Sequence, residues 1–510
     1  MCSRYTFATK SYEISDKVLH LVKTQQMKFL TSLLLLISVF VFCSINAQIT
    51  IGDPISVTND DNSFSYRTPK VEINGNGEPV VLWVKQGSLE ELYISRKSGS
   101  SFTEPVSIPL GGINPNIWSA NLGPGLAVHE NHVYVVFEKY GEAIYLSHSD
   151  DYGDTWDDPI AAFTPPTGRV ASIPNVAVGI DGNPLVSYVN TNQSEEDAHY
   201  GLVKSLDFGA TFSAEVQVNT AAVGSEVCEC CNGDVAVSEN GDIYVAFRNN
   251  NENVRDCWIA RSVDGGENFT LAYDMDETDW LVFACPSNGP NIFVDDNKAV
   301  VTFYTAATGW DNGAYYTALD LNSSEIGSTI SVPQSSESSS NQTAPRVAGE
   351  GDIIGVVTQE TISGTASIAM SISFEGPTGL QNESFQLFES NQTQRYPAVA
   401  FHDNRFHVVY EHSQTGTVYY QEVYVGPLSI DDYTETPIIA YPNPASNELF
   451  ITGFDHAVDV TVIDISGNRI LTKKVASNSS LSLTNLDNGI YFAEINDYKN
   501  IRTIKITVMR

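Results

Sequence analysis

Basic residues are scarce in this sequence: its 510 residues include 27 Lys and Arg against 62 Asp and Glu, a formal net charge of −35. Lys and Arg supply most of the affinity of proteins for the phosphates of nucleic acids, so this class of ligand is excluded. Charged residues make up only 17% of the chain, and segments with a long helical period are rare. This composition, rich in Gly and Tyr, predicts an all-β protein.

Long apolar runs are also lacking, apart from one at residues 30–43. Lys28 precedes this run and the small residues Ser44 and Ala47 follow it, which is typical of an export signal rather than of a membrane span. We therefore expect residues 1–47 to be an export signal, with Met27 as a natural start for it. The mature chain is expected to begin near Gln48.

A repeated unit dominates the following residues. Each copy contains an alternating strand, a turn rich in Gly, Asn and Asp, and a β-rich run that ends in an aromatic residue. Copies are spaced by 50 to 58 residues and start at Pro69, Pro124, Pro174, Asn232, Pro290, Pro345 and Pro397. This spacing predicts a seven-bladed β-propeller over residues 48–427. Residues 49–58 look like the fourth strands of other units, so we expect them to complete the last blade and close the ring.

Three turns of the repeat share the pattern Ser-x-Asp-x-Gly-x-Thr-aromatic or a close variant. They begin at Ser149, Ser205 and Ser262, and a degenerate fourth begins at Ser95. These segments resemble the Asp boxes of the sialidase-like propellers. The resemblance implies hairpins in which the Asp carboxylate accepts hydrogen bonds from turn amides and the Gly adopts a positive φ.

The carboxy-terminal part has a different pattern. It contains Tyr441-Pro442-Asn443-Pro444-Ala445, Asn488-Gly489 and a closing Lys505-Ile506. Together these resemble the carboxy-terminal sorting domain of type IX secretion. The resemblance implies a small immunoglobulin-like β-sandwich at residues 438–510 after a linker at 428–437. It also implies recognition by the type IX secretion machinery and a secreted or cell-surface location in a diderm bacterium; an ordinary immunoglobulin-like appendage is the alternative.

One face of the predicted propeller carries the candidate functional residues. Antiparallel topology brings the start of each first strand, the end of each second strand and the start of each third strand to this face, where ligand sites of propellers usually lie. The arginines expected here suit an anionic substrate because the guanidinium fork fits a carboxylate, although each could instead be a salt-bridge partner; they are Arg67, Arg248, Arg255 and Arg395. The proton-transferring candidates are His199 and Tyr304, with Tyr140 and His412 in reserve.

Tyr66-Arg67-Thr68-Pro69 resembles the Arg-Ile-Pro element of sialidases, whose arginine holds the carboxylate of sialic acid. The rest of the sialidase set is not evident. Val84-Lys85-Gln86 follows the second strand of the first unit without an acidic residue, and no Glu is clearly partnered with a late Tyr nucleophile.

Five cysteines remain after the export signal, an odd number that leaves one thiol unpaired or engages a metal. Cys228, Cys230, Cys231 and Cys285 lie where the fourth and fifth units begin, so we expect them to cluster. They predict either a structural zinc site or one or two disulfides, and no cofactor is expected to be required for chemistry.

Three functions are compatible with these features. The first is a carbohydrate-active enzyme that cleaves an acidic, uronic-acid-containing polysaccharide by β-elimination, which needs a cation, a base and an acid. The second is sialidase-like hydrolysis, supported by Arg67. The third is a non-catalytic glycan-binding propeller, for which loops such as residues 248–251 would suffice.

Overall fold

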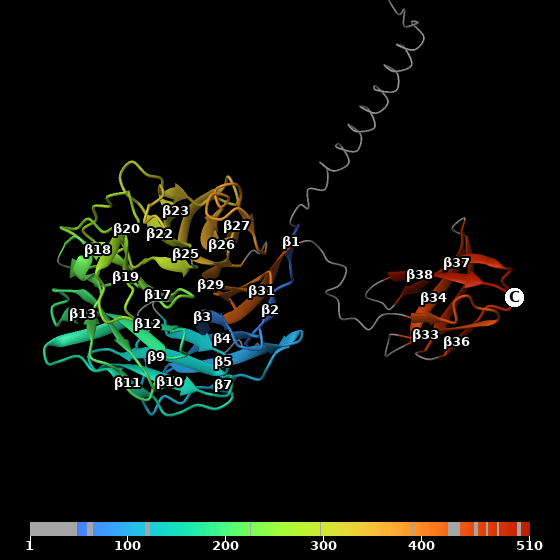
Figure 1. Cartoon of the computed structure of the whole chain (residues 1–510), viewed down its shortest axis with the longest axis horizontal. Helices are drawn as coiled ribbons and strands as arrows, with labels where there is room; N and C mark the ends of the chain where they lie inside the picture. The colour runs from blue at the N-terminus through green and yellow to red at the C-terminus, as the bar shows by residue number, and fades with distance from the viewer. Residues whose placement is uncertain are drawn as a thin grey trace, which may run out of the picture. The chain divides into compact units, whose positions relative to one another are not determined.

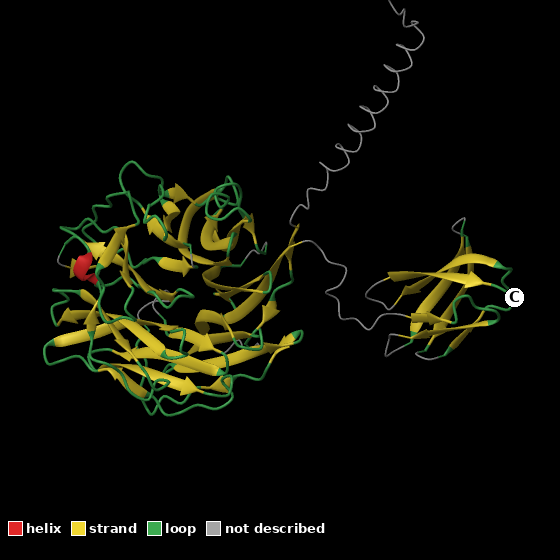
Figure 2. Ribbon diagram, in the orientation of Figure 1, coloured by secondary structure: helices red, strands yellow, loops and turns green. Residues whose placement is uncertain are grey.

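The computed structural model describes residues 48–58, 65–117, 123–224, 226–295, 297–388, 392–426, 439–452, 457–465, 468–476, 479–496 and 501–510. The expected export signal at 1–47 and the linker at 428–437 lie outside these residues. The chain divides into two compact units, Met1–Pro427 and Leu428–Arg510. Figure 2 shows strands in both units, with one short 3-10 helix, η1 (Asn219–Ala221), in the first. In the described ranges, no helix is long and apolar enough to cross a membrane.

Seven antiparallel sheets of four or five strands form the described part of the first unit, a β-propeller. We name these sheets blades 1 to 7 in chain order. Blade 1 contains β3 (Ser65–Ile73), β4 (Pro79–Gln86), β5 (Glu91–Ser98), β6 (Ser101–Phe102) and β7 (Val106–Ser107). Blade 2 contains β8 (Gly125–His129), β9 (His132–Lys139), β10 (Ala143–Ser149) and β11 (Ile160–Phe163). Blade 3 contains β12 (Arg169–Val178), β13 (Pro184–Asn192), β14 (His199–Lys204) and β15 (Val216–Gln217).

The remaining blades repeat this order. Blade 4 contains β16 (Glu226–Val227), β17 (Asp234–Val237), β18 (Ile243–Asn250), β19 (Cys257–Ser262) and β20 (Leu271–Asp274). Blade 5 contains β21 (Asn291–Val294), β22 (Lys298–Thr305), β23 (Gly313–Asp320) and β24 (Ile330–Ser331). Blade 6 contains β25 (Ser339–Glu350), β26 (Ile353–Ile362), β27 (Thr365–Ser373) and β28 (Phe385–Gln386). Blade 7 contains β29 (Gln394–His402), β30 (Arg405–His412) and β31 (Thr417–Gly426), completed by β1 (Gln48–Ile51) and β2 (Ile55–Ser56).

The amino-terminal strands join the last blade, as the repeat predicts. Gln48 pairs with Gly426 and Ile51 with Val423 in the register of β1 against β31, and Ile55 pairs with Tyr420. The first described residues therefore lie beside the last strand of the propeller, and this pairing removes an exposed edge from blade 7.

The second strand of each blade is buried on both faces because neighbouring blades pack against it. In β9 the sequence HVYVVFEK is a nearly continuous apolar run, and six of its eight residues are buried. Buried residues of blades 1 and 2 form one cluster and those of blades 2 and 3 the next, so the core is a series of inter-blade layers.

The three turns that begin at Ser149, Ser205 and Ser262 share one geometry. In the first, Gly153 N donates to Ser149 Oγ at 2.9 Å and Thr155 N donates to Asp151 Oδ1 at 2.7 Å. Gly153 has a φ of 91°, a conformation that glycine adopts at little cost. The other two turns repeat the Ser–Asp and Gly–Ser hydrogen bonds, so the pattern has a structural role.

The second unit has two sheets and its own core. They contain β32 (Ile439–Tyr441), β33 (Glu448–Thr452) and β36 (Ser480–Ser482), and β34 (Val458–Asp464), β35 (Arg469–Val475), β37 (Gly489–Asn496) and β38 (Ile501–Val508). Leu449, Val460 and Ile506 are fully buried in one cluster between them. The unit is a small β-sandwich, the fold expected for this part of the chain.

Candidate functional site

A channel of about 480 Å³ is lined by the innermost strands of all seven blades. In Figure 1, β3, β12, β17, β25 and β29 lie around the centre of the ring. The ionisable residues that line the channel are Lys70, Glu72, His129, Asp234 and Arg346. Asp234 accepts hydrogen bonds from Asn175 Nδ2 at 2.6 Å and from Ile292 N at 3.0 Å, and so links blade 4 to blades 3 and 5. Burial raises the pKa of Glu72 to about 8 and lowers that of Lys70 to about 8.

On the face predicted to be functional, four of the first strands contain a bulge before a proline. The bulged residues Thr68, Ile173, Ala344 and Tyr396 each precede a proline and have φ between 50° and 55°. The register of the pairing with the second strand shifts at each of these points. A positive φ in such residues is strained, so the surroundings must hold it in place.

In three of these bulges, an oxygen atom from the second strand of the preceding blade holds the strained residue. Glu138 Oε2 accepts a hydrogen bond from Ile173 N at 2.5 Å, and Gln359 Oε1 accepts one from Tyr396 N at 3.2 Å. Glu411 accepts the equivalent hydrogen bond from the backbone of Thr68. Side chains near the ends of β9, β26 and β30 therefore join each of these blades to the next blade of the ring.

The junction of blades 7 and 1 gathers two cations, two carboxyl groups and a phenol. We call Arg67, Glu90, Arg395, Tyr396 and Glu411 the blade 7/1 cluster. Arg67 Nη2 lies 2.7 Å from Glu90 Oε1. Arg395 is directly opposite Glu411 in the pairing of β29 with β30, and Arg395 is exposed. Both arginines act electrostatically on the carboxyl group of Glu411.

Several polar atoms of this junction are buried without a hydrogen-bond partner from the chain. They are Arg67 Nε, Glu90 Oε2, Glu411 Oε2 and the hydroxyl of Thr68. Buried polar groups in folded proteins are almost always paired, so these four atoms are available to bond an ordered water molecule or a ligand.

The protonation of the cluster suits acid–base chemistry near neutral pH. Burial raises the pKa of Glu411 to about 7, against the opposing effects of Arg395, the Thr68 amide and Arg67. Glu411 is 7% exposed. Burial also raises the pKa of Tyr396, and the neighbouring Glu411 raises it further. Glu411 can thus accept a proton at neutral pH while Tyr396 keeps one to donate.

The proton-transferring candidates from the sequence belong to four different blades. His199 has both ring nitrogens engaged: Arg169 Nη2 donates to Nδ1 at 3.0 Å, which leaves Nε2–H to donate to Glu215 Oε1 at 3.3 Å. Tyr304 Oη donates to Asn312 Oδ1 at 2.5 Å. His199 therefore has no lone pair to serve as a base in this arrangement.

The two reserve candidates lie elsewhere. Tyr140 is 45% exposed, and its hydroxyl donates to Glu195 Oε1 at 3.4 Å. His412 is 7% exposed and contacts the Thr415 hydroxyl at 2.8 Å, and burial lowers its pKa. Of the two, only His412 belongs to blade 7.

Two of the four predicted substrate-binding arginines are structural, which corrects the expectation. Arg248 is completely buried, and it donates to the carbonyl oxygens of Asn288 at 3.1 Å and Tyr304 at 2.7 Å, so it fastens blade 4 to blade 5. Arg255 is 7% exposed and donates to Cys228 Sγ at 3.1 Å and Glu229 Oε2 at 3.3 Å. Arg248 has no exposed surface and therefore cannot contact a polysaccharide, whereas the Arg255 guanidinium is already engaged by Cys228 and Glu229. Arg67 and Arg395 remain as candidates.

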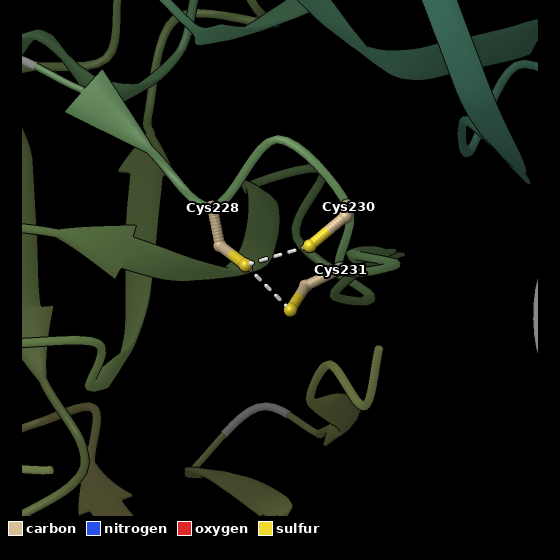
Figure 3. Close-up of side chains that lie close together, drawn as sticks. All are labelled: Cys228, Cys230 and Cys231. Atoms are coloured by element: carbon tan, nitrogen blue, oxygen red, sulfur yellow. Dashed lines mark hydrogen bonds between the residues drawn. The ribbon is translucent and has the colours of Figure 1, made fainter. Parts of the chain in front are cut away.

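The cysteines at the start of blades 4 and 5 cluster, as predicted. Cys230 and Cys285 form a disulfide, while Cys228, Cys231 and Cys257 are free and buried. In Figure 3, dashed lines join Cys228 Sγ to the sulfur atoms of Cys230, at 3.7 Å, and of Cys231, at 2.6 Å. A zinc site of four thiolates would require the Cys230–Cys285 bond to be reduced, and it stays a prediction.

Sequence reasoning missed Glu90, Tyr396 and Glu411 as members of a site. A signal for Glu411 was present: Glu138, Gln359 and Glu411 occupy the same position near the end of a second strand, each one blade before a residue–proline pair. Glu90 left no comparable signal, because it lies in the turn before β5 and meets Arg67 only when the blade folds.

The comparisons with known proteins give one match to a family model and several similar solved structures. The family described as the secretion system C-terminal sorting domain matches residues 439–509. No curated protein sequence matches the chain significantly.

Solved structures similar to the chain include a protein of unknown function from Dyadobacter fermentans, 14% identical over 74% of this chain and 99% of that chain, with a TM-score of 0.44. A Hadza microbial sialidase is 13% identical over 74% of this chain and 68% of that chain, with a TM-score of 0.40. The polysaccharide lyase Uly1 is 11% identical over 70% of this chain and 89% of that chain, with a TM-score of 0.41. Residues 439–509 are thus a sorting domain, which links the chain to the type IX secretion system and to a secreted or cell-surface location.

Proposed function

We propose that this protein is an exported carbohydrate-active enzyme that cleaves an acidic, uronic-acid-containing glycan at the blade 7/1 cluster. The observation that carries the proposal is the position of Glu411, a buried carboxyl group with a pKa of about 7 opposite Arg395 and beside the strand of Arg67. Perturbed carboxyl groups at a ligand-facing surface are typical of catalytic sites. The sorting domain supports the export of such an enzyme to its polymeric substrate.

The cluster supplies each group that β-elimination needs. Arg67 and Arg395 would bind the uronate carboxylate and stabilise the negative charge that develops there when the C5 proton leaves. Glu411, as the carboxylate, would take that proton. Tyr396 would donate its phenolic proton to the departing glycosidic oxygen. The products would be an unsaturated uronate and a free hydroxyl end.

The role of Glu90 in this reaction is to orient Arg67. Its Oε1 holds Nη2 of Arg67 at 2.7 Å, and both side chains are mostly buried, at 21% and 15% exposure. A guanidinium that is fixed before substrate arrives loses little further freedom on binding, which favours affinity for a carboxylate.

Hydrolysis is the second candidate, and the presence of two carboxyl groups favours it. Glu90 and Glu411 flank Arg67, and most glycoside hydrolases use a pair of carboxyl groups as acid and base. In this reaction water would be the nucleophile, and no double bond would form.

Activity on a panel of glycans would test the proposal. The mature chain is incubated with uronate polymers and with sialylated glycans. An increase in ultraviolet absorbance from an unsaturated uronate indicates elimination, and released sugar without that absorbance indicates hydrolysis. Binding without either product would contradict the enzyme proposal and favour a glycan-binding propeller.

Three variants locate the reaction. Glu411→Gln and Tyr396→Phe should each lower turnover by ~10²–10⁴, whereas Arg67→Ala should also weaken binding. Arg96→Ala is the matched control, because Arg96 pairs with Asp154 at 2.7 Å outside the cluster. Full activity in both Glu411→Gln and Tyr396→Phe would refute the assignment.

A further inference from the structure

The thiol groups of Cys228 and Cys231 lie in direct contact at the start of blade 4. They are separated by two residues, and Cys231 N approaches the Cys228 carbonyl oxygen at 3.4 Å, so a tight turn brings the two side chains together. Both residues are completely buried. Their Sγ atoms are 2.6 Å apart, only about 0.5 Å longer than a disulfide bond.

A second disulfide lies directly beside this pair. Cys228 Sγ is 3.7 Å from Cys230 Sγ, which is bonded to Cys285. Cys285 is exposed and Cys230 is half-buried, whereas Cys228 and Cys231 have no exposed surface. The exposed disulfide is therefore more accessible to an external oxidant than the buried pair.

We propose that Cys228 and Cys231 form a second disulfide in the exported protein, and that they are oxidised through the Cys230–Cys285 disulfide. An exported protein is in a compartment where disulfides persist. With both bonds formed, Cys257 alone keeps a thiol, which accounts for the odd number of cysteines after the export signal.

The exchange balances without a metal or cofactor. The Cys228 sulfur, as the thiolate, attacks Cys230 Sγ; a Cys228–Cys230 bond forms, the Cys230–Cys285 bond breaks, and the Cys285 thiolate leaves and takes up a proton. Cys231 then loses its proton and attacks Cys228 Sγ; the Cys228–Cys231 bond forms, the Cys228–Cys230 bond breaks, and the departing Cys230 thiolate takes up that proton. An external small-molecule disulfide re-oxidises Cys230 and Cys285 and is itself reduced to two thiols.

Arg255 positions the attacking sulfur. Its Nη1 donates to Cys228 Sγ at 3.1 Å and is also held by Glu229 Oε2 at 3.3 Å. A guanidinium in contact favours the thiolate form of a cysteine, which is the nucleophile in thiol–disulfide exchange.

Counting free thiols tests the second disulfide. The mature exported chain is isolated without reductant, denatured, alkylated and weighed by mass spectrometry. We expect one alkylated cysteine, and the structure with the Cys230–Cys285 bond alone would give three. Three labels in the wild-type protein, or zinc bound in equimolar amount by the native protein, would overturn the proposal.

Single variants add a test that depends on the direction in which the number of alkylated cysteines changes from the wild-type value, and not on the labelling yield. Cys231→Ser should raise the count from one to two, because it frees Cys228, and Cys228→Ser should do the same by freeing Cys231. If the pair were not bonded, the same substitutions would lower the count from three to two. Cys257→Ser is the matched control and should lower the count from one to zero. Circular dichroism checks that each variant is folded.

The exchange route has its own test. The native protein is reduced and then re-oxidised with hydroxyethyl disulfide, and formation of the Cys228–Cys231 bond is followed by quenched alkylation. In Cys230→Ser the bond should form at least ~10-fold more slowly, because Cys228 loses the neighbouring sulfur through which it is oxidised. Equal rates would show that the external oxidant reaches the buried pair directly and would overturn the exchange route.

Discussion

Glu411 in blade 7 accepts a hydrogen bond from the backbone N–H of Thr68 in blade 1. The contact joins β30 of blade 7 to β3 of blade 1, at the same junction that carries Arg67 and Arg395. Glu138 and Ile173 make the equivalent contact between blades 2 and 3. Glu411 therefore makes the same inter-blade contact as Glu138. It differs in having two arginines nearby and an Oε2 atom without a hydrogen-bond partner from the chain.

Stability should fall between mildly acidic and neutral pH. The folded-state pKa of Glu411 is about 7, above its ordinary value of 4.5, so the folded protein retains a proton that the unfolded chain has lost in this window. The free energy of unfolding then decreases as pH rises through the window, by up to ~3 kcal/mol for this group. Asp256, with a pKa of about 7, acts in the same direction.

Urea denaturation at pH 5 and pH 7.5 measures this effect. Glu411→Gln keeps a hydrogen-bond acceptor for Thr68 but does not titrate, so it should reduce the difference between the two midpoints. An unchanged difference would show that the carboxyl group does not carry a raised pKa.

The pH dependence of catalysis should have the opposite sense to that of stability. If Glu411 is the base, it acts only as the carboxylate, so turnover should increase as pH rises through about 7, the pKa of Glu411. The measurement is the initial rate of product formation between pH 5 and 9 on the glycan found by screening. A rate that falls over pH 6 to 8 would instead assign Glu411 as the acid.

Loss of the closing strands should destabilise the propeller. Deleting residues 48–58 exposes the edge of β31 and removes Val57, which is 4% exposed in the core between blades 7 and 1. We expect the melting temperature to fall by ~5 °C or more and aggregation to increase. Val57→Asp should reproduce much of the loss, whereas Ile51→Asp, at 39% exposure, should have little effect. An unaffected deletion variant would show that the closure is dispensable.

The conserved turn geometry of the three repeats should matter for stability and not for catalysis. Asp151 accepts hydrogen bonds from Thr155 N at 2.7 Å, from the Thr155 hydroxyl and from the Ser149 hydroxyl. Asp151→Ala should lower the melting temperature by ~2–4 °C. Asp150→Ala removes the same charge next to it and serves as the control. Equal melting temperatures for the two variants would contradict a structural role for the turn.

Removal of the sorting domain should affect export and leave the propeller folded. The two units have separate cores, so a chain that ends at residue 427 should melt like the full-length protein. In a host with a type IX system, immunoblots of cells and medium should show the truncated chain retained in the cells. Unchanged export of the truncated protein would contradict the assigned role.

The sequence by itself determined the architecture. The spacing of the prolines, the three Ser-x-Asp turns and the pattern of residues 49–58 each reflect local backbone requirements that repeat along the chain, so they can be recognised without knowledge of distant contacts. The same holds for the sorting domain, whose motifs lie within residues 439–509.

Only the tertiary structure decided which polar residues form a site. Both Arg67 and Arg248 lie near the end of a strand in the sequence, yet Arg67 stays partly exposed beside Glu90, whereas Arg248 is fully buried among the carbonyl groups of Arg255, Asn288 and Tyr304. Likewise, His199 loses its lone pair to Arg169, and Glu411 gains its raised pKa from burial between blades. These properties depend on desolvation and on partners from other blades, and the physical effect of each is set by the fold and not by local sequence.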